Sequence, residues 1–486
     1  MLDALLDAQR RFGGKVAVAD ARLQLTYKRL AALAAVMRDI IIAETPAPRI
    51  GILLPASAIF PAALFGTWWA GRIPVPLNFL LAPNELAAIT SDADLDLILS
   101  VKPLAKIVGP LPVRTLLLDE LPLKRKVLMR MLRRAPDPLP VQPSDTAVLL
   151  YTSGTSGLPK GVELSFGNLR TNCEASIAAA DLDPSHRMLN VLPPFHVFGL
   201  TANVLMPVLL GASVYAIPRF NPRAAVRAVQ EQGLSMMMAI PSMYAAMIRT
   251  KGFPKDALQT LQLAESGGEP LPEAVETGFM ERFGIQLVQG YGLTETSPVV
   301  SLSSMANWRP GSVGRPIADV EVRILDDERN QLQTGQAGEI CVRGPNVMKG
   351  YYRQPEQTDL VIDLDGWFRT GDVGSLDTDG YLYISARIKD LIIVGGENVY
   401  PREIEAVLEQ HSAVAEAAVV GVEDKSRGQV PVAFVGLLDG AAATESELRT
   451  FARQRLAGYK TPRRVHIVDQ LPRSPTGKVL KRALTE

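Results

Sequence analysis

The chain has 486 residues, of which 47% are apolar and 21% are charged, and its formal net charge is zero. This length is too great for one ordinary hydrophobic core, so we expect two or three domains. A neutral chain lacks the basic excess that is typical of nucleic-acid-binding proteins. The two cysteines provide neither a disulfide framework nor a metal cluster. The four histidines show no metal-ligand spacing.

Strand-like apolar runs alternate with helical patterns through most of the chain, which predicts an α/β fold with mostly parallel sheets. Residues 50–71 carry no charge and are long enough to span a bilayer. Pro55 and Pro61 interrupt this run, so we interpret it as a buried strand, a proline break and a core helix that ends near Gly71. No signal peptide opens the chain, and we expect a cytoplasmic protein.

Residues 123–134 predict a basic amphipathic helix. Its basic residues flank an apolar face made of Leu123, Val127, Leu128, Met131 and Leu132. Such a helix can lie on an anionic membrane, so peripheral membrane contact is one hypothesis. The same surface could dock an acidic carrier protein, or it could be the solvated face of an ordinary surface helix. The proline-rich residues 136–143 then predict an extended connector.

An apolar strand over residues 145–150 is followed by "YTSGTSGLPKGVELS", residues 151–165. Glycines let backbone amides turn inward, hydroxyls add donors, and Lys160 adds a fixed charge, which together suit a polyphosphate. A flexible serine- and glycine-rich linker is the plainer alternative. The Walker pattern fails here because Pro159 precedes the lysine and Gly161 follows it, which argues against kinase-like transfer. We assign phosphate binding to Thr152, Ser153, Gly154, Thr155, Ser156, Gly157 and Lys160, with Thr155 also a candidate catalytic residue.

This loop resembles the signature of adenylate-forming enzymes, which include acyl-CoA synthetases, luciferases and the adenylation domains of peptide synthetases. Further motifs follow in the order of that family over nearly the whole chain. The resemblance implies a large multi-layer N-terminal domain over residues 1–386 and a small, mobile α+β domain over residues 387–486. It also implies ATP, Mg²⁺ and CoA as cofactors.

The segment "LPPFHVFGL", residues 192–200, lines the acyl pocket in that family. Members that activate amino acids carry an aspartate just after the phenylalanine, where this chain has His196. A histidine is a poor partner for a substrate ammonium group, which argues against an amino-acid substrate. We therefore count His196 among the candidate catalytic residues, with a packed core histidine as the alternative.

Two motifs, at 265–272 and 289–300, match the nucleotide-binding segments of the family. By resemblance, the residues that contact the nucleotide are Gly267, Gly268, Glu269, Gln289, Gly290, Tyr291, Gly292 and Thr294. Tyr291 offers an aromatic face for adenine, and Thr294 offers a hydroxyl near the phosphates. Glu295 offers a hard oxygen ligand, so we expect it to bind Mg²⁺ and to act in catalysis.

The segment "GWFRTGDVGSLDTDGYLYI" predicts a hairpin with Asp-Gly turns. By the family resemblance, Asp372 in this segment accepts hydrogen bonds from the ribose hydroxyls of ATP. Arg387 matches the arginine that reaches the ribose or phosphate, although Ala386 stands where the family usually has glycine. By the same resemblance, Lys389 is the hinge residue. Gly396 lies beside the tunnel for the thiol arm, where backbone and thiol come close.

The remaining C-terminal residues predict a small α+β unit, with a helix from Pro401, two strands within 413–438 and a helix from Thr444. Thr444 and Glu447 form a predicted capping box. Near the end, the Pro-Thr-Gly-Lys turn contains Lys478. By resemblance this lysine contacts ATP and catalyses adenylation, although such a run is often only a solvated basic tail.

We therefore predict an enzyme that activates a carboxylic acid with ATP as acyl-AMP and passes the acyl group to CoA. A medium- or long-chain fatty acid is the preferred substrate. The alternatives are an acyl-carrier-protein synthetase, an aryl-acid CoA ligase and, from a different class, a non-catalytic acyl or nucleotide binder. Acyl carrier protein is thus a candidate partner, nucleic acid is not, and the oligomeric state stays open.

Overall fold

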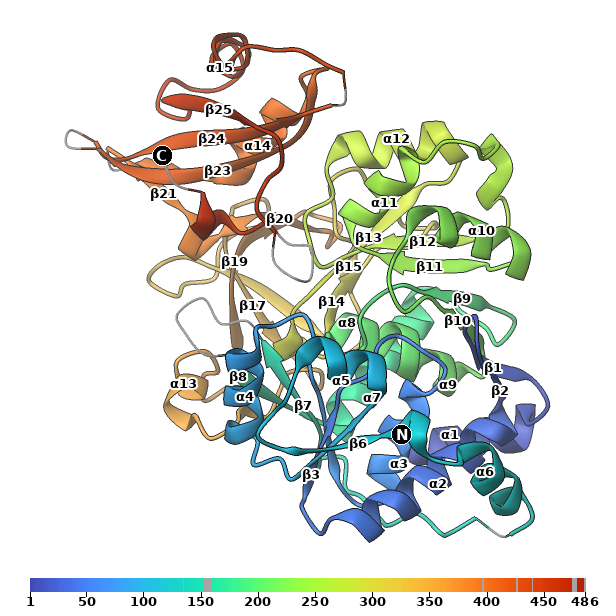
Figure 1. Ribbon diagram of the computed structural model, residues 1–486. Coiled ribbons are helices and arrows are strands. Elements are labelled where there is room, and N and C mark those ends of the chain that lie inside the picture. Colours follow the sequence, from blue (N-terminus) through green and yellow to red (C-terminus); the bar gives the residue numbers. More distant parts are fainter. Residues whose placement is uncertain are drawn as a thin grey trace.

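The computed structural model of the chain describes residues 1–133, 135–152, 159–395, 397–424, 427–438, 440–473 and 479–484. Residues up to Arg387 supply the strands of four sheets, and later residues supply a fifth sheet. Figure 1 shows this last part, in orange and red, as a smaller domain beside the larger N-terminal one. The predicted class, a large α/β domain followed by a small α+β domain, is confirmed.

A nine-stranded sheet is the centre of the N-terminal domain. Its six inner strands, from β13 to β1, run parallel, and antiparallel strands complete both edges. The sheet order is β15 (Arg315–Pro316), β14 (Val299–Leu302), β13 (Leu287–Gly292), β12 (Leu263–Ser266), β11 (Met236–Ala239), β9 (Arg187–Asn190), β10 (Ser213–Ala216), β1 (Val16–Ala19) and β2 (Gln24–Thr26).

Helices cover both faces of this sheet, as a buried parallel sheet requires. Accordingly, every residue of β11 and β12 is buried. One face packs on α10 (Pro222–Gln232), α11 (Pro241–Ile248) and α12 (Glu273–Phe283). The other packs on α7 (Phe166–Ala179), α8 (Val197–Leu200), the π-helix η2 (Thr201–Leu205) and α9 (Met206–Leu210).

A second, fully parallel sheet has the order β4 (Ile73–Pro76), β3 (Arg49–Ile52), β5 (Leu97–Ser100) and β6 (Arg114–Leu117). The uncharged run 50–71 contributes β3 and then α3 (Phe60–Trp69), in which every residue is buried. Pro61 lies in the first turn of α3, where its missing N–H costs no helical hydrogen bond. The predicted strand, break and core helix are thus confirmed. Among the described residues, no helix is long and apolar enough to cross a membrane.

The remaining helices of the N-terminal domain surround these sheets, and α2 packs along α3. They are α1 (Leu2–Phe12), α2 (Tyr27–Glu44), α4 (Pro83–Asp92), α5 (Lys102–Val108), α6 (Leu123–Met131) and α13 (Pro355–Asp359). Helix α6 ends three residues earlier than predicted. Its apolar face is also divided, because Leu123 and Val127 pack on the core whereas Leu128 and Leu132 are exposed.

The phosphate-loop segment joins two antiparallel strands. A three-stranded antiparallel sheet has the order β18 (Gly350–Tyr351), β8 (Lys160–Ser165) and β7 (Thr146–Thr152). The loop between β7 and β8 is therefore the turn of a hairpin, whereas a Walker loop connects a strand to a helix. Residues 153–158 of this loop, which include the predicted Ser153, Gly154, Thr155, Ser156 and Gly157, lie outside the described residues.

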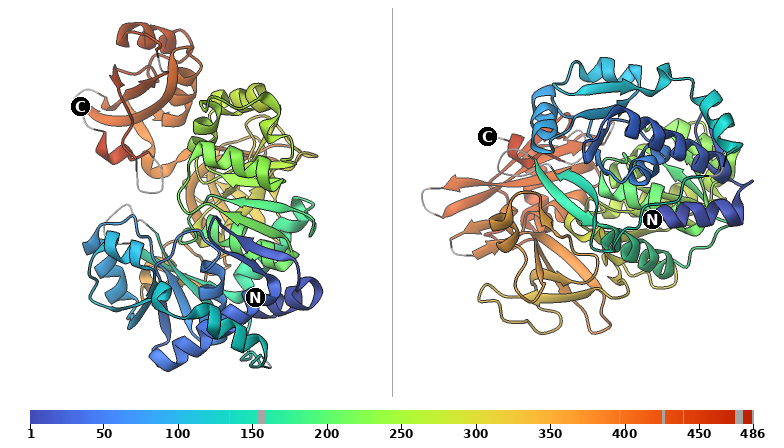
Figure 2. Two further views of the ribbon diagram at one scale, coloured as in Figure 1. Left: turned by 45° about the vertical axis from the view of Figure 1, so that its right-hand side comes forward. Right: turned by 90° about the horizontal axis from the view of Figure 1, so that it is seen from below.

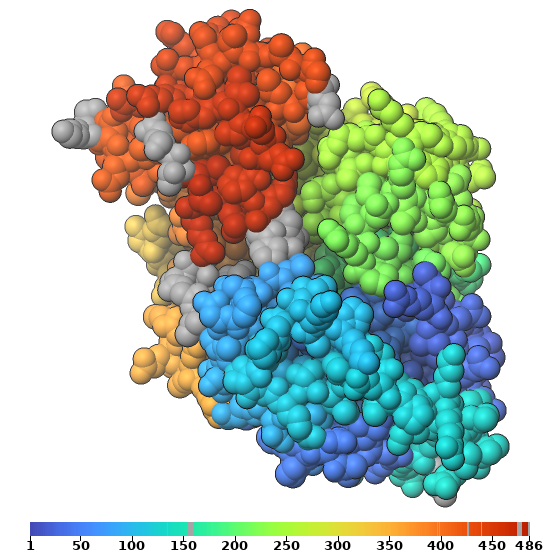
Figure 3. Space-filling view, in the orientation of Figure 1, coloured from blue at the N-terminus to red at the C-terminus, as the bar shows by residue number. Residues whose placement is uncertain are grey.

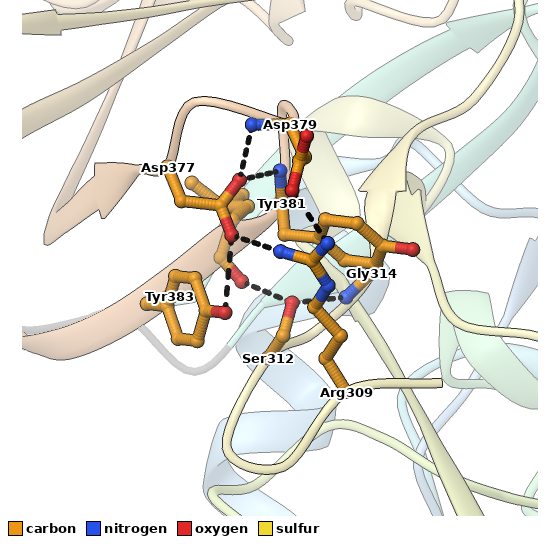
Figure 4. Close-up of polar contacts among 8 residues, drawn as sticks. Arg309, Ser312, Gly314, Asp377, Asp379, Tyr381 and Tyr383 are labelled. Atoms are coloured by element: carbon orange, nitrogen blue, oxygen red, sulfur yellow. Dashed lines mark hydrogen bonds and ion pairs between the residues drawn. The ribbon is translucent and has the colours of Figure 1, made fainter. Parts of the chain in front are cut away.

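A four-stranded antiparallel sheet leads to the C-terminal domain. Its order is β16 (Glu321–Leu325), β17 (Gly338–Arg343), β19 (Phe368–Leu376) and β20 (Leu382–Arg387). As predicted, β19 and β20 form a hairpin, and Gly380 in its turn has a positive φ of 79°. Figure 4 shows how Arg309 reaches this turn, with ion pairs of 2.8 Å to Asp377 and 2.6 Å to Asp379.

The C-terminal domain is a sheet flanked by two helices, α14 (Pro401–Glu409) and α15 (Glu445–Arg453). Its strands lie in the order β22 (Glu397–Val399), β21 (Ile392–Val394), β24 (Gly428–Leu437) and β23 (Val414–Asp424), and β25 (Arg464–Val468) also pairs with β24. Pro401 opens α14 as predicted. The capping box of α15 is present, since Thr444 and Glu447 each accept a hydrogen bond from the other's backbone N–H.

Candidate active site

A large cleft lies between the two domains, and its volume is about 2380 Å³. In the space-filling view, a groove separates the orange and red C-terminal domain from the green region around α12 (Figure 3). Both domains contribute residues to the cleft lining. Figure 2 shows the ribbons of the two domains from two further directions. The predicted residues that line it are Thr152, Lys160, His196, Gly267, Gly268, Glu269, Gln289, Gly290, Tyr291, Gly292, Thr294, Glu295, Asp372, Arg387 and Lys389.

The carboxyl ends of two neighbouring parallel strands form the floor of this cleft. Gly267, Gly268 and Glu269 follow β12, and residues 289–292 end β13, with Ser266 paired to Gln289. Ligands of open α/β sheets bind at such strand ends. The glycines are required here for close packing: a Cβ at position 292 would lie 1.9 Å from the carbonyl oxygen of Pro298. The two predicted nucleotide-binding motifs therefore meet in space.

A three-residue polar network connects this floor to the antiparallel sheet. Asp372 and Arg387 are register partners on β19 and β20, and Arg387 Nε lies 2.6 Å from Asp372 Oδ1. The Tyr291 hydroxyl donates to Asp372 Oδ2 at 2.7 Å. Asp372 is buried, with 2% exposure. Burial, together with the adjacent Asp372 charge, raises the pKa of Tyr291 well above its usual value, so Tyr291 remains a hydrogen-bond donor.

Glu295 is held at the edge of the cleft by a tyrosine from β18. It lies in the short 3₁₀ helix η4 (Thr294–Thr296), and the Tyr351 hydroxyl donates to its Oε1 at 2.9 Å. Burial and the charge of Glu295 raise the pKa of Tyr351, which keeps this donor protonated. The same tyrosine ring lies under Lys160, whose Nζ is 4.7 Å from the ring centroid. Tyr351 thus links the phosphate-loop lysine to the predicted metal ligand.

Lys160 extends from the start of β8 into this region. Its Nζ donates to Gln357 Oε1 at 2.9 Å. Thr152, at the end of β7, lies opposite, and its hydroxyl donates to the Lys160 carbonyl at 3.5 Å. The two described ends of the phosphate loop therefore both face the cleft.

His196 precedes α8 and lines the same cleft. Its Nδ1 accepts a hydrogen bond from the Phe198 backbone N–H at 3.3 Å, so the imidazole caps this short helix. The side chain is half-buried rather than enclosed in the core. A half-buried side chain that lines the cleft differs from a packed core histidine, the alternative interpretation.

Lys389 lies in the 3₁₀ helix η5 (Ile388–Asp390), which joins β20 to β21. Burial and the nearby Arg387 charge lower the pKa of Lys389. Gly396 and Lys478, the predicted tunnel and adenylation residues, lie outside the described residues. Arg473 and Val479, which flank the segment containing Lys478, both line the cleft.

Two residues of the cleft that the predictions did not name, Tyr351 and Glu265, are relevant to its chemistry. Tyr351 lies far from the motifs in sequence, and only the pairing of β18 with β8 brings it to Glu295. Glu265 is the last acidic residue before the Gly-Gly pair of the adenine motif, and it lies buried on β12 with 6% exposure. A charged residue inside an apolar strand was the available sequence signal for Glu265.

The AMP-binding enzyme family matches residues 5–352, and its C-terminal domain family matches residues 403–478. These two matches include every predicted site residue that the structure places in the cleft except Asp372, Arg387 and Lys389, which lie between them. The chain belongs to the AMP-binding enzyme family.

The relatives of this chain include proteins named as CoA synthases and CoA ligases. This AMP-binding enzyme is 37% identical to a feruloyl-CoA synthase of Amycolatopsis over 90% of this chain and 88% of the relative. It is 35% identical to a long-chain-fatty-acid–CoA ligase of Salmonella typhimurium over 90% of this chain and 85% of that one. The predicted membership in the adenylate-forming enzymes is confirmed.

Solved structures of similar enzymes have the same fold. ATP-bound MatB from Rhodopseudomonas palustris matches with a TM-score of 0.90 at 29% identity, covering 99% of this chain and 97% of that one. The O-succinylbenzoate–CoA synthetase of Bacillus subtilis, in complex with ATP and a magnesium ion, matches with a TM-score of 0.84 at 30% identity, covering 99% and 98%. Both domains of the AMP-binding enzyme are thus found together in known enzymes of this type.

Proposed function

We propose that this AMP-binding enzyme joins a carboxylic acid to CoA at the expense of ATP. The observation that carries the proposal is the convergence, in one cleft, of the Tyr291–Asp372–Arg387 network with Glu295 and the phosphate-loop ends. A carboxylate is a poor electrophile, and conversion to a mixed anhydride removes that barrier. The substrate carboxylate attacks the α-phosphorus of ATP, acyl-AMP forms and pyrophosphate leaves. The CoA sulfur then attacks the acyl carbon, and AMP leaves.

The nucleotide would lie along the floor of the cleft. Asp372 offers carboxylate oxygens to the ribose hydroxyls, and Arg387 beside it can reach the ribose or the phosphate. Tyr291 and the segment 267–269 border the adenine. Thr294, Lys160 and the phosphate loop would hold the phosphates with hydroxyls, amides and a positive charge.

Glu295 fits a magnesium site of the kind that is completed by phosphate. One of its oxygens is fixed by Tyr351, which orients the carboxylate toward the cleft. Within the described residues, no group of three histidine, cysteine, aspartate or glutamate side chains could hold a metal alone. Mg²⁺ usually takes one or two carboxylates together with phosphate oxygens and water. When bound, the ion neutralises negative charge on the phosphates.

The two chemical steps would use different positions of the C-terminal domain. We place the domain boundary between residues 386 and 387, with Lys389 as the hinge. One position brings Lys478 to the adenylation step, where its charge stabilises the approach of two anions. The other position brings Gly396 to the cleft, where a glycine leaves room for the thiol arm. Closure in each position would exclude water from acyl-AMP.

A medium- or long-chain fatty acid is our first candidate substrate. His196, in the place of an ammonium-binding aspartate, and the similarity to a long-chain-fatty-acid–CoA ligase support this choice. An aryl acid is the second candidate, supported by the similarity to a feruloyl-CoA synthase. CoA is the proposed acceptor, with acyl carrier protein as the alternative.

An ATP–pyrophosphate exchange assay with a panel of acids tests the proposal. We expect ATP–pyrophosphate exchange that depends on the acid. Addition of CoA or acyl carrier protein should then give a thioester. Amino acids should support less AMP release than octanoate or palmitate. A chain that binds nucleotide but supports no exchange with any acid would instead be a non-catalytic binder.

A further inference from the structure

A small cavity lies behind the cleft, between the nine-stranded sheet and the helices α7–α9. Its volume is about 10 Å³, which is room for one water-sized group. Most of its lining is apolar and includes Phe198, Met206, Met236, Met238, Val299 and Leu302. Phe198, Val299 and Glu265 line both this inner cavity and the cleft. A group that extends from the cleft past these side chains would therefore enter the inner cavity.

Glu265 brings a carboxyl group into this apolar surrounding. It is paired in register with Met238 on β11 and Val288 on β13, in the interior of the sheet. The side chain is 6% exposed and also lines the cleft. Among the described residues, burial alone shifts its pKa, with no hydrogen bond or ion pair to the carboxyl. A buried polar group without a partner is costly, so such a group normally finds a partner in protein, water or ligand.

The backbone around Glu265 makes room for this carboxyl. Gly290 lies beside it on β13, and a Cβ at that position would approach Glu265 Oε1 to 2.6 Å. The Tyr244 hydroxyl donates to the backbone carbonyl of Glu265 at 2.8 Å, which helps to fix the backbone at this position. The site is therefore built around the carboxyl.

Ser176 supplies a second polar group to the same cavity. It extends from α7 and is 2% exposed, and its hydroxyl has no hydrogen-bond partner among the described residues. Two unpartnered polar side chains, each more than nine-tenths buried, thus line one small cavity. Burial also raises the pKa of Glu265 to about 7, so near neutral pH its carboxyl can both donate and accept hydrogen bonds.

We infer that the acid substrate carries a hydroxyl group on the part distal to its carboxylate, and that Glu265 and Ser176 bind this hydroxyl in the inner cavity. The inference rests on the proposed ligase function and deepens it. A hydroxyl can donate to the carboxyl oxygen and accept from the Ser176 hydroxyl, which satisfies both orphaned groups. A plain alkyl or aryl end cannot itself pair with either group, so we expect the site to favour the hydroxylated acid.

A hydroxyaryl acid and a hydroxylated fatty acid share this chemistry, and two matched pairs of acids separate them. The pairs are 4-hydroxycinnamate with cinnamate, and 8-hydroxyoctanoate with octanoate. For one pair we expect kcat/KM for CoA-thioester formation to be at least about tenfold higher with the hydroxylated acid. The pair that shows the preference identifies the acyl class. Equal kcat/KM within both pairs would overturn the inference.

Variants test whether the two side chains cause the preference. Glu265→Met, which keeps the side-chain length, should abolish the preference by lowering kcat/KM for the hydroxylated acid and sparing its parent. Ser176→Ala should act in the same direction with a smaller effect. Ser303→Ala is the matched control, because it removes another buried, unpartnered hydroxyl that lines neither cavity. Equal losses for both members of a pair in Glu265→Met would show a structural role and contradict the inference.

Calorimetric binding of the four acids separates this inference from the proposed function. Tighter binding of a hydroxylated acid that is lost in Glu265→Met supports the inner cavity even if no acid drives AMP release. If the unsubstituted acids drive AMP release as well as the hydroxylated ones, the ligase function holds and the inference fails.

Discussion

Two buried carboxylates of the cleft, Asp372 and Glu265, have opposite surroundings. Asp372 is bonded by Tyr291 on one oxygen and by Arg387 on the other. Glu265 lies among methionines and a phenylalanine, and the described residues offer its carboxyl no partner. In the roles proposed above, the carboxylate that the protein itself pairs serves a ligand of fixed chemistry, the nucleotide. The carboxyl without such a partner serves the variable part of the substrate.

Lys478→Ala should have the largest effect, and it should impair the reaction with the nucleotide without changing how the acyl group is bound. Removing one transition-state contact typically costs about 10²- to 10³-fold in rate. Acyl-AMP formation from acid and ATP should fall by this factor, whereas thioester formation from synthetic acyl-AMP and CoA should stay near normal. Separation of AMP, acyl-AMP and acyl-CoA on one column measures both steps. Equal loss of both steps would mean that the lysine acts through folding or domain position.

Glu265→Gln should stabilise the protein in a pH-dependent way. The folded-state pKa of about 7 lies above the ordinary value of 4.5, so the folded protein binds the proton more tightly. The stability of the wild type should therefore fall as pH rises from about 5 to 7 and level off above that range. The titratable Tyr244 packs beside Glu265, and burial keeps it protonated in this range. At pH 8 the variant should be more stable by up to about 3 kcal/mol, and at pH 4.5 nearly equal.

Denaturant unfolding of both proteins at several pH values measures this difference. Parallel stability curves would show that the pKa of Glu265 is the same in the folded and unfolded states. That result would make the two carboxylates alike and remove the basis of the comparison.

Asp372→Asn should destabilise the protein where Glu265→Gln stabilises it. The amide has one oxygen to serve two donors, Tyr291 and Arg387, and it lacks the charge. A lost buried hydrogen bond of this kind costs about 1–3 kcal/mol. Binding of ATP should weaken as well, which nucleotide titration would detect. Unchanged stability together with unchanged nucleotide affinity would contradict the role given to the network.

Lys389→Pro should affect the two half-reactions unequally. Proline fixes φ and removes an N–H, which should hinder a rotation that starts at η5. We expect thioester formation to fall at least about tenfold, and adenylation to fall less. The two steps can be assayed separately with the same reagents as for Lys478→Ala. Equal losses would count against a hinge at Lys389.

Helix α6 contains neither Asp372 nor Glu265 and does not line the cleft, so substitutions on its surface should leave catalysis intact. The exposed side chains Leu128, Met129 and Leu132 lie beside basic residues on its surface. Replacement of Lys124, Arg125, Lys126 and Arg133 by glutamine should weaken sedimentation with anionic vesicles if this helix contacts a membrane. Equal sedimentation before and after the change would remove the membrane hypothesis, and the helix would be an ordinary solvated one.

The comparison also shows which parts could be predicted from sequence. The glycines, hydroxyls and charges of the predicted nucleotide-binding segments form contiguous motifs. Asp372, Tyr291 and Glu295 could therefore be named from the sequence, and the structure places all three at the cleft. The strand, break and helix within 50–71 followed from its prolines. Glu265 and Tyr351 were missed because their roles depend on which strands are neighbours. The pairing of β12 between β11 and β13 buries Glu265, and no local pattern encodes that pairing.

The cluster in Figure 4 bears on how the two domains can move. Arg309 holds both aspartates of the β19–β20 turn, and the backbone of Leu382 exchanges hydrogen bonds with Val313 and Gly314. Cross-links at these points fix the torsion angles of the hairpin relative to the N-terminal domain. A change of orientation of the C-terminal domain would therefore draw its torsion-angle changes from the few residues after Arg387. With so short a pivot, the axis of any such rotation would be well defined.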